Sequence, residues 1–168
     1  DYTLLGVDGS LRPGAREVME RLSGDGHELY IWSGNGIRWL EVRRHGLEHL
    51  VSDCFEKPMD GYADAVELLG PQTRPDLVVD DHMEVPAALG GIWVRPYYFR
   101  DEADDEMERV YGIIGEWVRR GRSDDPRFRA PPRQRALWDD SQQDAEPPFR
   151  PSPLYLIGGC GRPIPPWS

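Results

Sequence analysis

The chain has few cysteines, no long apolar run and a shortage of basic side chains. Only two cysteines occur among 168 residues, Cys54 and Cys160, and they form no CxxC pair. This argues against a disulfide framework or a cysteine zinc site, and it favours a reducing, cytoplasmic compartment. No apolar stretch approaches the roughly 20 residues that span a bilayer, so we expect no membrane segment.

The charge balance is acidic. Asp and Glu number 30 against 20 Lys and Arg, which gives a formal net charge of -10. Such a surface repels the phosphates of nucleic acids and of acidic membranes. We therefore expect a soluble protein that binds neither, and whose partners are neutral, basic or bridged by a metal ion.

Apolar periodicity predicts an α/β domain over residues 1–120. Short apolar runs alternate there with helical patterns, which indicates crossover units and a mostly parallel sheet covered on both faces. The expected strands are residues 3–7, 29–32, 51–55, 77–79 and 92–94. The expected helices are residues 13–22, 37–45, 62–69 and 106–119.

Beyond residue 121 the composition changes. Proline recurs at positions 126, 131, 132, 147, 148, 151, 153, 163, 165 and 166, and apolar periodicity is lost. Such a segment does not build its own core and is typical of a flexible or extended arm. We therefore expect residues 121–168 to form an extended Pro- and Arg-rich arm, which either lies along the acidic body or reaches a protein partner.

Polar and charged side chains follow the expected strands at their carboxyl ends. They are Asp8, Ser33, Lys57, Asp80 and Asp81. In a parallel sheet this edge is where ligands bind. Backbone N–H groups around Gly34, at the start of a helix, would bind an anion. Lys57 could balance phosphate charge, and the paired aspartates could hold a hard divalent ion such as Mg²⁺.

These segments resemble four motifs of the haloacid dehalogenase (HAD) superfamily, specifically its capless magnesium-dependent phosphatases. The family's first motif, Asp-x-Asp-Gly-Thr/Ser-Leu, aligns with Gly6-Val7-Asp8-Gly9-Ser10-Leu11. The other three align with Ser33, with Lys57-Pro58 and with Val78-Val79-Asp80-Asp81. The resemblance covers residues 3 to about 98. It implies a HAD-like three-layer sandwich without a cap domain, because only one short helix separates the first motif from the second, and another separates the second from the third.

The resemblance also implies roles for the residues. Asp8 takes the acid/base place, while Ser33, Gly34 and Lys57 hold the phosphoryl group. The Mg²⁺ ligands would be Asp8, Asp80 and Asp81. Gly6 stands where the family has its attacking aspartate, so covalent catalysis is lost. An open cleft without a lid implies a macromolecular ligand.

Two interpretations of function remain open. The preferred one is a catalytically silent HAD-like domain that serves as a protein-interaction or assembly subunit, with or without retained phosphate or metal binding. The alternative is a capless magnesium-dependent phosphatase acting on a macromolecular or other phosphomonoester. Each residue also has a structural explanation: Asp8-Gly9 as a turn, Ser33 as a helix cap, and Lys57 as the counter-charge of the aspartate pair.

Overall fold

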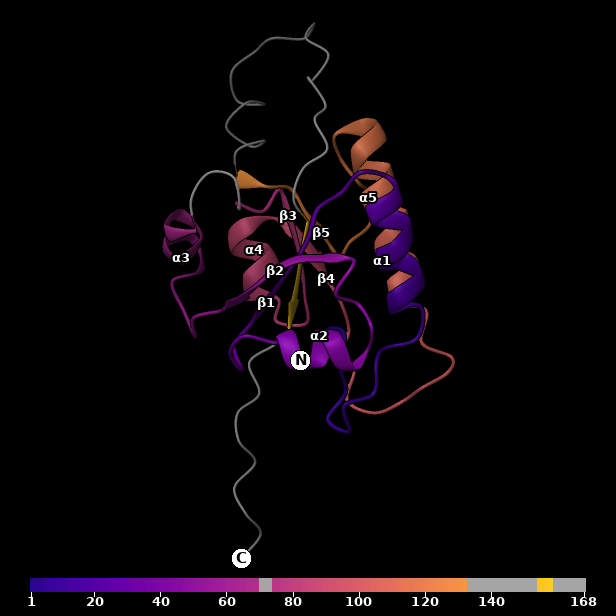
Figure 1. The fold of residues 1–168 in the computed structure, drawn as a ribbon. Helices are drawn as coiled ribbons and strands as arrows, with labels where there is room; N and C mark the ends of the chain where they lie inside the picture. Colours follow the sequence, from indigo (N-terminus) through magenta and orange to yellow (C-terminus); the bar gives the residue numbers. More distant parts are fainter. Residues whose placement is uncertain (70–73, 133–153, 159–168) are drawn as a thin grey trace, which may run out of the picture.

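The computed structural model describes residues 1–69, 74–132 and 154–158, and the strands in this part form one sheet (Figure 1). The strand order is β2-β1-β6-β3-β4-β5. The strands are β1 (Leu29–Ser33), β2 (Val51–Glu56), β3 (Leu77–Asp80), β4 (Gly91–Trp93), β5 (Phe128–Arg129) and β6 (Leu154–Gly158). Neighbouring strands are parallel except for β4 and β5, which confirms the expected mostly parallel sheet.

Helices cover both faces of the sheet. They are α1 (Ala15–Gly24), α2 (Trp39–Arg44), α3 (Tyr62–Leu68), α4 (Glu84–Leu89) and α5 (Glu106–Arg120). Helices α1 and α5 lie together on one face, and α3 and α4 lie on the other (Figure 1). The expected α/β class is therefore confirmed. None of the described helices combines the length and apolar content needed to cross a bilayer.

Burial of both faces explains why the sequences of β1 and β3 are almost continuously apolar. In β1, Leu29 and Ile31 belong to the core under α1 and α5, whereas Tyr30 and Trp32 belong to the core under α3 and α4. Successive side chains of a strand point to opposite faces, so each face needs its own apolar set. Apolar side chains on both faces are therefore what allow β1 to lie inside the sheet.

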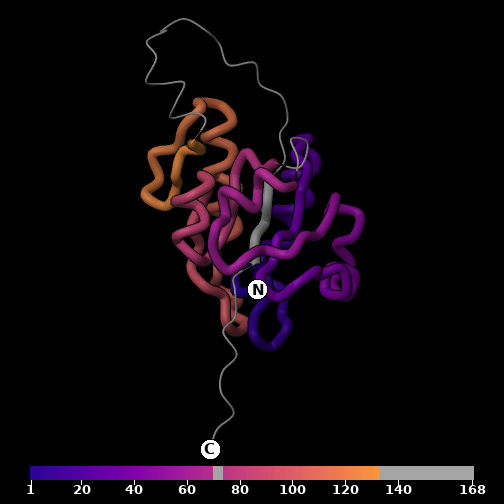
Figure 2. The backbone as a smooth tube through the Cα atoms, turned by 90° about the vertical axis from the view of Figure 1, so that its left-hand side faces the viewer, coloured from indigo at the N-terminus to yellow at the C-terminus, as the bar shows by residue number. Residues whose placement is uncertain are grey.

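The expected strand at residues 3–7 is wrong. Residues 5–11 instead form a hairpin loop, in which a single antiparallel bridge pairs Leu5 with Leu11. The N–H of Gly6 donates to the carbonyl of Ser10 over 2.9 Å, and the N–H of Val7 donates to the carbonyl of Tyr98 over 2.7 Å. These bonds hold the loop against the segment that follows β4. Both segments lie at the same end of the molecule in the two views (Figures 1 and 2).

Parts of the expected arm belong to the sheet. Strand β5 pairs with β4, and β6 lies between β1 and β3, with Leu154 opposite both Leu29 and Leu77. The boundary expected at residue 120 therefore does not separate an extended arm from the described body. The remainder of that segment, residues 133–153 and 159–168, and the partner contact expected of it lie outside the described residues.

Candidate functional site

Four of the expected site residues meet at the carboxyl edge of the sheet. Ser33 ends β1, Lys57 follows β2, and Asp80 ends β3 with Asp81 directly after it. All four are buried, with no more than 8% of any residue exposed. The strands run parallel, so their carboxyl ends lie at one edge, as the sequence indicated.

Lys57 and Asp80 form a buried ion pair. Lys57 Nζ lies 2.8 Å from Asp80 Oδ2, and the main-chain N–H of His82 donates to Asp80 Oδ1 over 2.7 Å. Burial raises the pKa of Asp80 to about 6, although Lys57 favours its ionised form. The counter-charge explanation of Lys57 is therefore correct, and a bound phosphate would share this lysine with Asp80.

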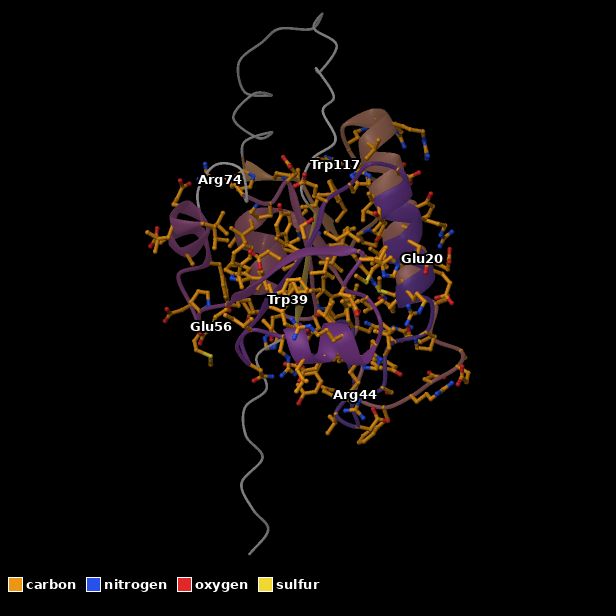
Figure 3. The ribbon with its side chains drawn as sticks, viewed as in Figure 1. Glu20, Trp39, Arg44, Glu56, Arg74 and Trp117 are labelled. Atoms are coloured by element: carbon orange, nitrogen blue, oxygen red, sulfur yellow. The ribbon has the colours of Figure 1, made fainter. Side chains whose placement is uncertain are left out.

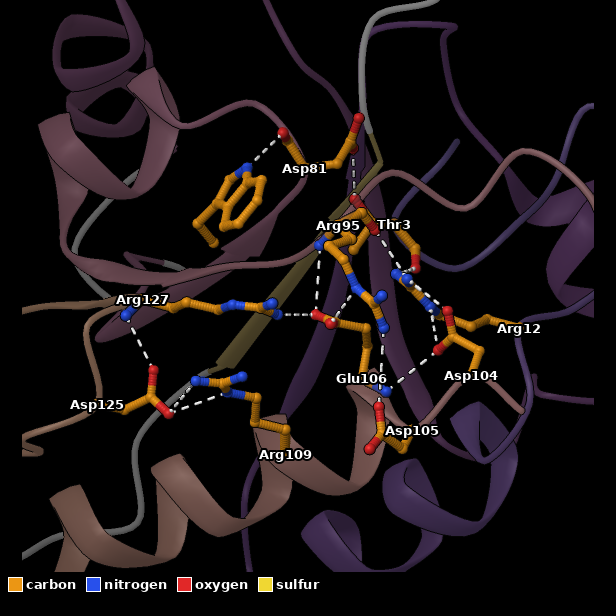
Figure 4. A network of polar contacts seen from close by, with 11 residues as sticks. Thr3, Arg12, Asp81, Arg95, Asp104, Asp105, Glu106, Arg109, Asp125 and Arg127 are labelled. Carbon is orange, nitrogen blue, oxygen red and sulfur yellow. Dashed lines mark hydrogen bonds and ion pairs between the residues drawn. The ribbon is translucent and has the colours of Figure 1, made fainter. Parts of the chain in front are cut away.

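Asp81 is oriented by neutral donors. The hydroxyl of Thr3, a fully buried residue, donates to Asp81 Oδ1 over 2.8 Å, and the indole N–H of Trp93 donates to the Asp81 carbonyl over the same distance (Figure 4). His82 Nε2 lies 3.7 Å from the other carboxylate oxygen. No lysine or arginine of the described chain forms an ion pair with Asp81, so its carboxylate is available to a cation.

A fifth group, Asp1, enters the site from the N-terminal segment. Its carboxylate accepts hydrogen bonds from Asn35 and Arg38 and lies 3.4 Å from Ser33 Oγ. Its main-chain nitrogen is within electrostatic reach of Asp80 and Asp81. We use the name site cluster for these five residues: Asp1, Ser33, Lys57, Asp80 and Asp81.

The backbone conformation of Tyr2 directs the side chains of Asp1 and Thr3 toward the site. Tyr2 has φ +59°, a left-handed conformation that costs a side-chain-bearing residue about 1–3 kcal/mol. Hydrogen bonds of 2.7 Å from the Tyr2 N–H to the Leu5 carbonyl and from the Tyr97 N–H to the Tyr2 carbonyl hold it there. Asp1 consequently meets Ser33, while Thr3 meets Asp81.

A buried arginine locks this segment to the rest of the fold. Arg12 is 1% exposed, and it donates to the Thr3 carbonyl over 2.9 Å and to the Arg95 carbonyl over 2.7 Å. It also holds Asp104 through two hydrogen bonds of 2.9 Å (Figure 4). Sequence reasoning missed Arg12, because a single arginine beside Pro13 carries no motif.

The structure does not bring Asp8 to the site. Asp8 is exposed on the hairpin loop, where its carboxylate accepts bonds from the hydroxyl (2.5 Å) and N–H (2.9 Å) of Ser10. These bonds lower the pKa of Asp8 below its ordinary value. Asp8 also accepts a main-chain hydrogen bond from Arg100, after β4. None of these bonds reaches the site cluster, so the structure does not support Asp8 as acid/base or metal ligand. The turn explanation of Asp8-Gly9 is correct.

Gly6 does not occupy a vacated nucleophile position either. A Cβ at Gly6 would lie 2.7 Å from Asp8 Oδ1 and 2.8 Å from the Tyr98 carbonyl. Contacts this short require the loop to shift, so close packing is what demands glycine here. The inference that catalysis was lost at Gly6 therefore loses its basis.

Gly34 does not open a helix. Helix α2 begins only at Trp39, and residues 34–35 form a turn in which the N–H of Asn35 donates to Ser33 Oγ over 3.2 Å. Ser33 thus closes a local turn instead of capping a helix. The expected anion site at a helix start around Gly34 is wrong, and Asn35 and Arg38 are the anion-binding groups that lie beside Ser33.

The expected Mg²⁺ ligand set is not assembled, since Asp8 lies on the hairpin loop. Across residues 1–69, 74–132 and 154–158, no three His, Cys, Asp or Glu side chains are grouped to hold a metal ion. Asp80 is engaged by Lys57, so Asp81 is the side chain that could hold a cation. Mg²⁺ is commonly bound by one or two carboxylates, with waters and substrate phosphate oxygens completing its shell, and Asp81 suits that arrangement.

Comparison with protein-family models, curated proteins and solved structures finds no match for this chain. A second copy of the Asp-x-Thr/Ser-Leu pattern, Asp1-Tyr2-Thr3-Leu4, is the sequence signal that could have identified Asp1 and Thr3.

Proposed function

We propose that the site cluster binds a phosphomonoester together with a divalent cation, and that the chain is a HAD-type domain. The observation that supports this proposal is the convergence of Asp1, Ser33, Lys57 and the aspartate pair at one sheet edge. These groups come from four separate segments of the chain. A phosphate requires hydrogen-bond donors and a positive charge, and its metal ion requires carboxylate oxygens. Both kinds of group lie at this edge of the sheet.

Each group has a distinct part in binding. Ser33 Oγ and Lys57 Nζ donate to phosphate oxygens, and Asp81 holds the cation that bridges to the same phosphate. Lys57 and Arg38 offset the charges of Asp80 and Asp1. The carboxylate of Asp81 has no such partner among the described lysines and arginines, so it would repel a bare phosphate. Binding of the phosphate therefore depends on the divalent cation.

The favoured form of this function is binding without turnover. The register of β6 places Gly158 opposite Ser33, on the strand between β1 and β3. The resemblance to HAD phosphatases assigns the attacking aspartate to the carboxyl end of such a strand, and glycine supplies no nucleophile there. The domain would then act by recognising a phosphorylated ligand, as an interaction or assembly unit.

Hydrolysis is the second candidate, and Asp1 favours it. Its carboxylate lies 3.4 Å from Ser33 Oγ, next to where the phosphate would bind. A carboxyl group there could protonate a leaving oxygen or activate water. Asp1 thus takes the acid/base place that the sequence assigned to Asp8.

Binding and hydrolysis of p-nitrophenyl phosphate, measured on the same samples, test both candidate functions. Calorimetry should detect binding with Mg²⁺ and none without it. Ser33→Ala and Asp81→Asn should each weaken binding about tenfold or more, since a hydrogen bond to a charged group contributes about 1.5–3 kcal/mol. Asp8→Asn is the matched control and should bind normally.

Release of p-nitrophenolate from the same samples decides between binding and hydrolysis. Binding alone predicts no Mg²⁺-dependent release, whereas hydrolysis predicts release that Asp1→Asn abolishes. Absence of binding, or binding that Ser33→Ala and Asp81→Asn leave unchanged, would contradict both candidates.

A further inference from the structure

A cavity of about 260 Å³ opens beside the site cluster, between the hairpin loop and α2. Its near side includes Asp1, Asn35 and Arg38, which also surround Ser33. Its far side includes Gly9 and Arg44. A ligand whose phosphate lies on Ser33 would therefore extend its remaining atoms into this space. The volume is below the roughly 300 Å³ at which pockets for drug-sized ligands begin, so it suits a group of a few heavy atoms.

Two arginines line the cavity, and they differ in their partners. Arg38 pairs with the Asp1 carboxylate and with Glu41 at 3.2 Å, so acidic neighbours already balance its charge. Arg44, at the end of α2 (labelled in Figure 3), makes no hydrogen bond or ion pair with any described residue. Within the described part of the chain, the charge of this guanidinium group is therefore not compensated.

Hydrogen bonds hold the end of α2, which carries Arg44, against its neighbours. His45 Nε2 lies 3.0 Å from the carbonyl oxygen of Gly9, which joins the end of α2 to the hairpin loop. Arg16 binds the carbonyls of His45 and Gly46 from the other side. The guanidinium of Arg44 lies against the hairpin loop, with Nη1 3.6 Å from where a Cβ on Gly9 would stand. The backbone that carries Arg44 is thus held beside the cavity, and its side chain is exposed.

This inference rests on the proposed function and narrows its ligand class. We propose that the ligand is a phosphomonoester with a second anionic group, and that Arg44 binds this second group in the cavity. Asp1 and Glu41 do not neutralise Arg44, because both are paired with Arg38. A phosphate ester of a neutral alcohol gains nothing from Arg44, so the residue discriminates between the two kinds of ester.

The test compares two probes that share a phosphate and a three-carbon skeleton. Glycerol 3-phosphate is neutral beyond its phosphate, whereas 3-phosphoglycerate carries a carboxylate. With Mg²⁺ present, calorimetry should show about two- to fivefold tighter binding of 3-phosphoglycerate, as expected for one solvent-exposed ion pair. Arg44→Gln should remove this preference and leave glycerol 3-phosphate binding unchanged.

Arg43→Gln is the matched control. Arg43 is the preceding residue of α2, is also exposed and does not line the cavity, so this variant should keep the preference. Two outcomes would overturn the role of Arg44 without contradicting the phosphate site. One is equal binding of the two probes by the unaltered chain, and the other is a preference for 3-phosphoglycerate that survives in Arg44→Gln. Failure of both probes to bind would overturn the proposed function and this inference together.

Discussion

Asp80 is a residue whose protonation the fold controls directly. Burial raises its pKa from 3.8 to about 6, against the attraction of Lys57. The folded state therefore holds this proton more tightly than the unfolded chain does. The stability that Asp80 contributes is present below about pH 4 and is lost as the pH rises through about 6.

We expect the carboxyl ¹³C resonance of Asp80 to titrate near pH 6. Lys57→Met should move that midpoint higher, because it removes the cation that favours the carboxylate. Asp8 is the internal control, since the bonds from Ser10 should make it titrate below its ordinary value. An Asp80 midpoint below about pH 4 would show that the Lys57 pair outweighs burial.

Thr3 is a positioning residue for Asp81. Its hydroxyl donates to Asp81 Oδ1 over 2.8 Å, and replacing Thr3 by valine keeps the shape while removing that donor. Loss of a hydrogen-bond partner that orients a metal ligand typically costs about tenfold or more in metal affinity. We therefore expect Thr3→Val to weaken Mg²⁺ binding in the presence of phosphate by about tenfold.

A Mg²⁺ titration of phosphate binding measures this effect. Thr3→Ser keeps the hydroxyl and should retain most of the affinity, which separates the hydrogen bond from packing. Unaltered Mg²⁺ affinity in Thr3→Val, at comparable thermal stability, would show that Thr3 does not orient the metal ligand.

Residues at strand ends could be predicted, whereas those in the N-terminal loop could not. Ser33, Lys57 and the aspartate pair follow apolar strands, and parallel topology alone brings them together. The pattern Asp-x-Thr/Ser-Leu occurs at both Asp1 and Asp8, and the apolar run before Asp8 favoured that copy. That run is a loop because of distant contacts, such as the bond from Val7 to Tyr98, that local sequence does not encode.

Among the elements, the hairpin loop differs most from the sequence-based prediction, which placed a strand at residues 3–7 and a lost nucleophile at Gly6. If Gly6 were a lost nucleophile, Gly6→Asp would restore turnover. The structure instead predicts that a side chain at Gly6 clashes with the Tyr98 carbonyl at 2.8 Å. We expect Gly6→Asp and Gly6→Ala to lower the free energy of unfolding by about 1–3 kcal/mol, with no gain of phosphatase activity.

Urea unfolding measures this change, and Gly24→Ala is the control. Gly24 ends α1, and a Cβ there would meet no atom within 4 Å beyond its chain neighbours and its own helix backbone, so alanine should be neutral or stabilising by up to about 1 kcal/mol. Strong Mg²⁺-dependent turnover by Gly6→Asp would restore Gly6 to the active site and contradict the geometry.

Helices α1, α3 and α5 and strands β1 and β3 were predictable because burial imposes a strong apolar pattern, whereas helix α4 was not predicted. The apolar stripe of α1 consists of Ala15, Val18, Met19 and Leu22, all of them completely buried. Weaker patterns gave larger errors. Helix α2 buries only Val42 and begins two residues later than expected, since one buried position leaves its start undefined.

The molecule as a whole depends on β6 to join the two halves of its sheet. β6 pairs with β1 on one side and β3 on the other, and in the described part of the chain those two strands have no direct pairing. The sequence did not predict this, because the apolar run of β6 lies within a Pro-rich segment and its partners are distant in the chain.

Truncated chains test whether the folded sheet requires β6. A chain ending at residue 153 lacks the strand and should lose cooperative thermal unfolding, since β1 and β3 would each present unpaired backbone groups. A chain ending at residue 158 retains β6 and should unfold cooperatively. An unchanged transition in the shorter chain would show that the sheet does not need this strand.

The central claim is that phosphate and Mg²⁺ bind at the site cluster and not at the hairpin loop. Amide resonances of the ¹⁵N-labelled chain, followed as phosphate and Mg²⁺ are added together, test it most directly. We predict the largest shifts at Ser33, Asn35, Lys57 and Asp81, with the amides of residues 7–9 almost unmoved. Shifts confined to residues 6–10, with Ser33 and Lys57 unaffected, would contradict the claim.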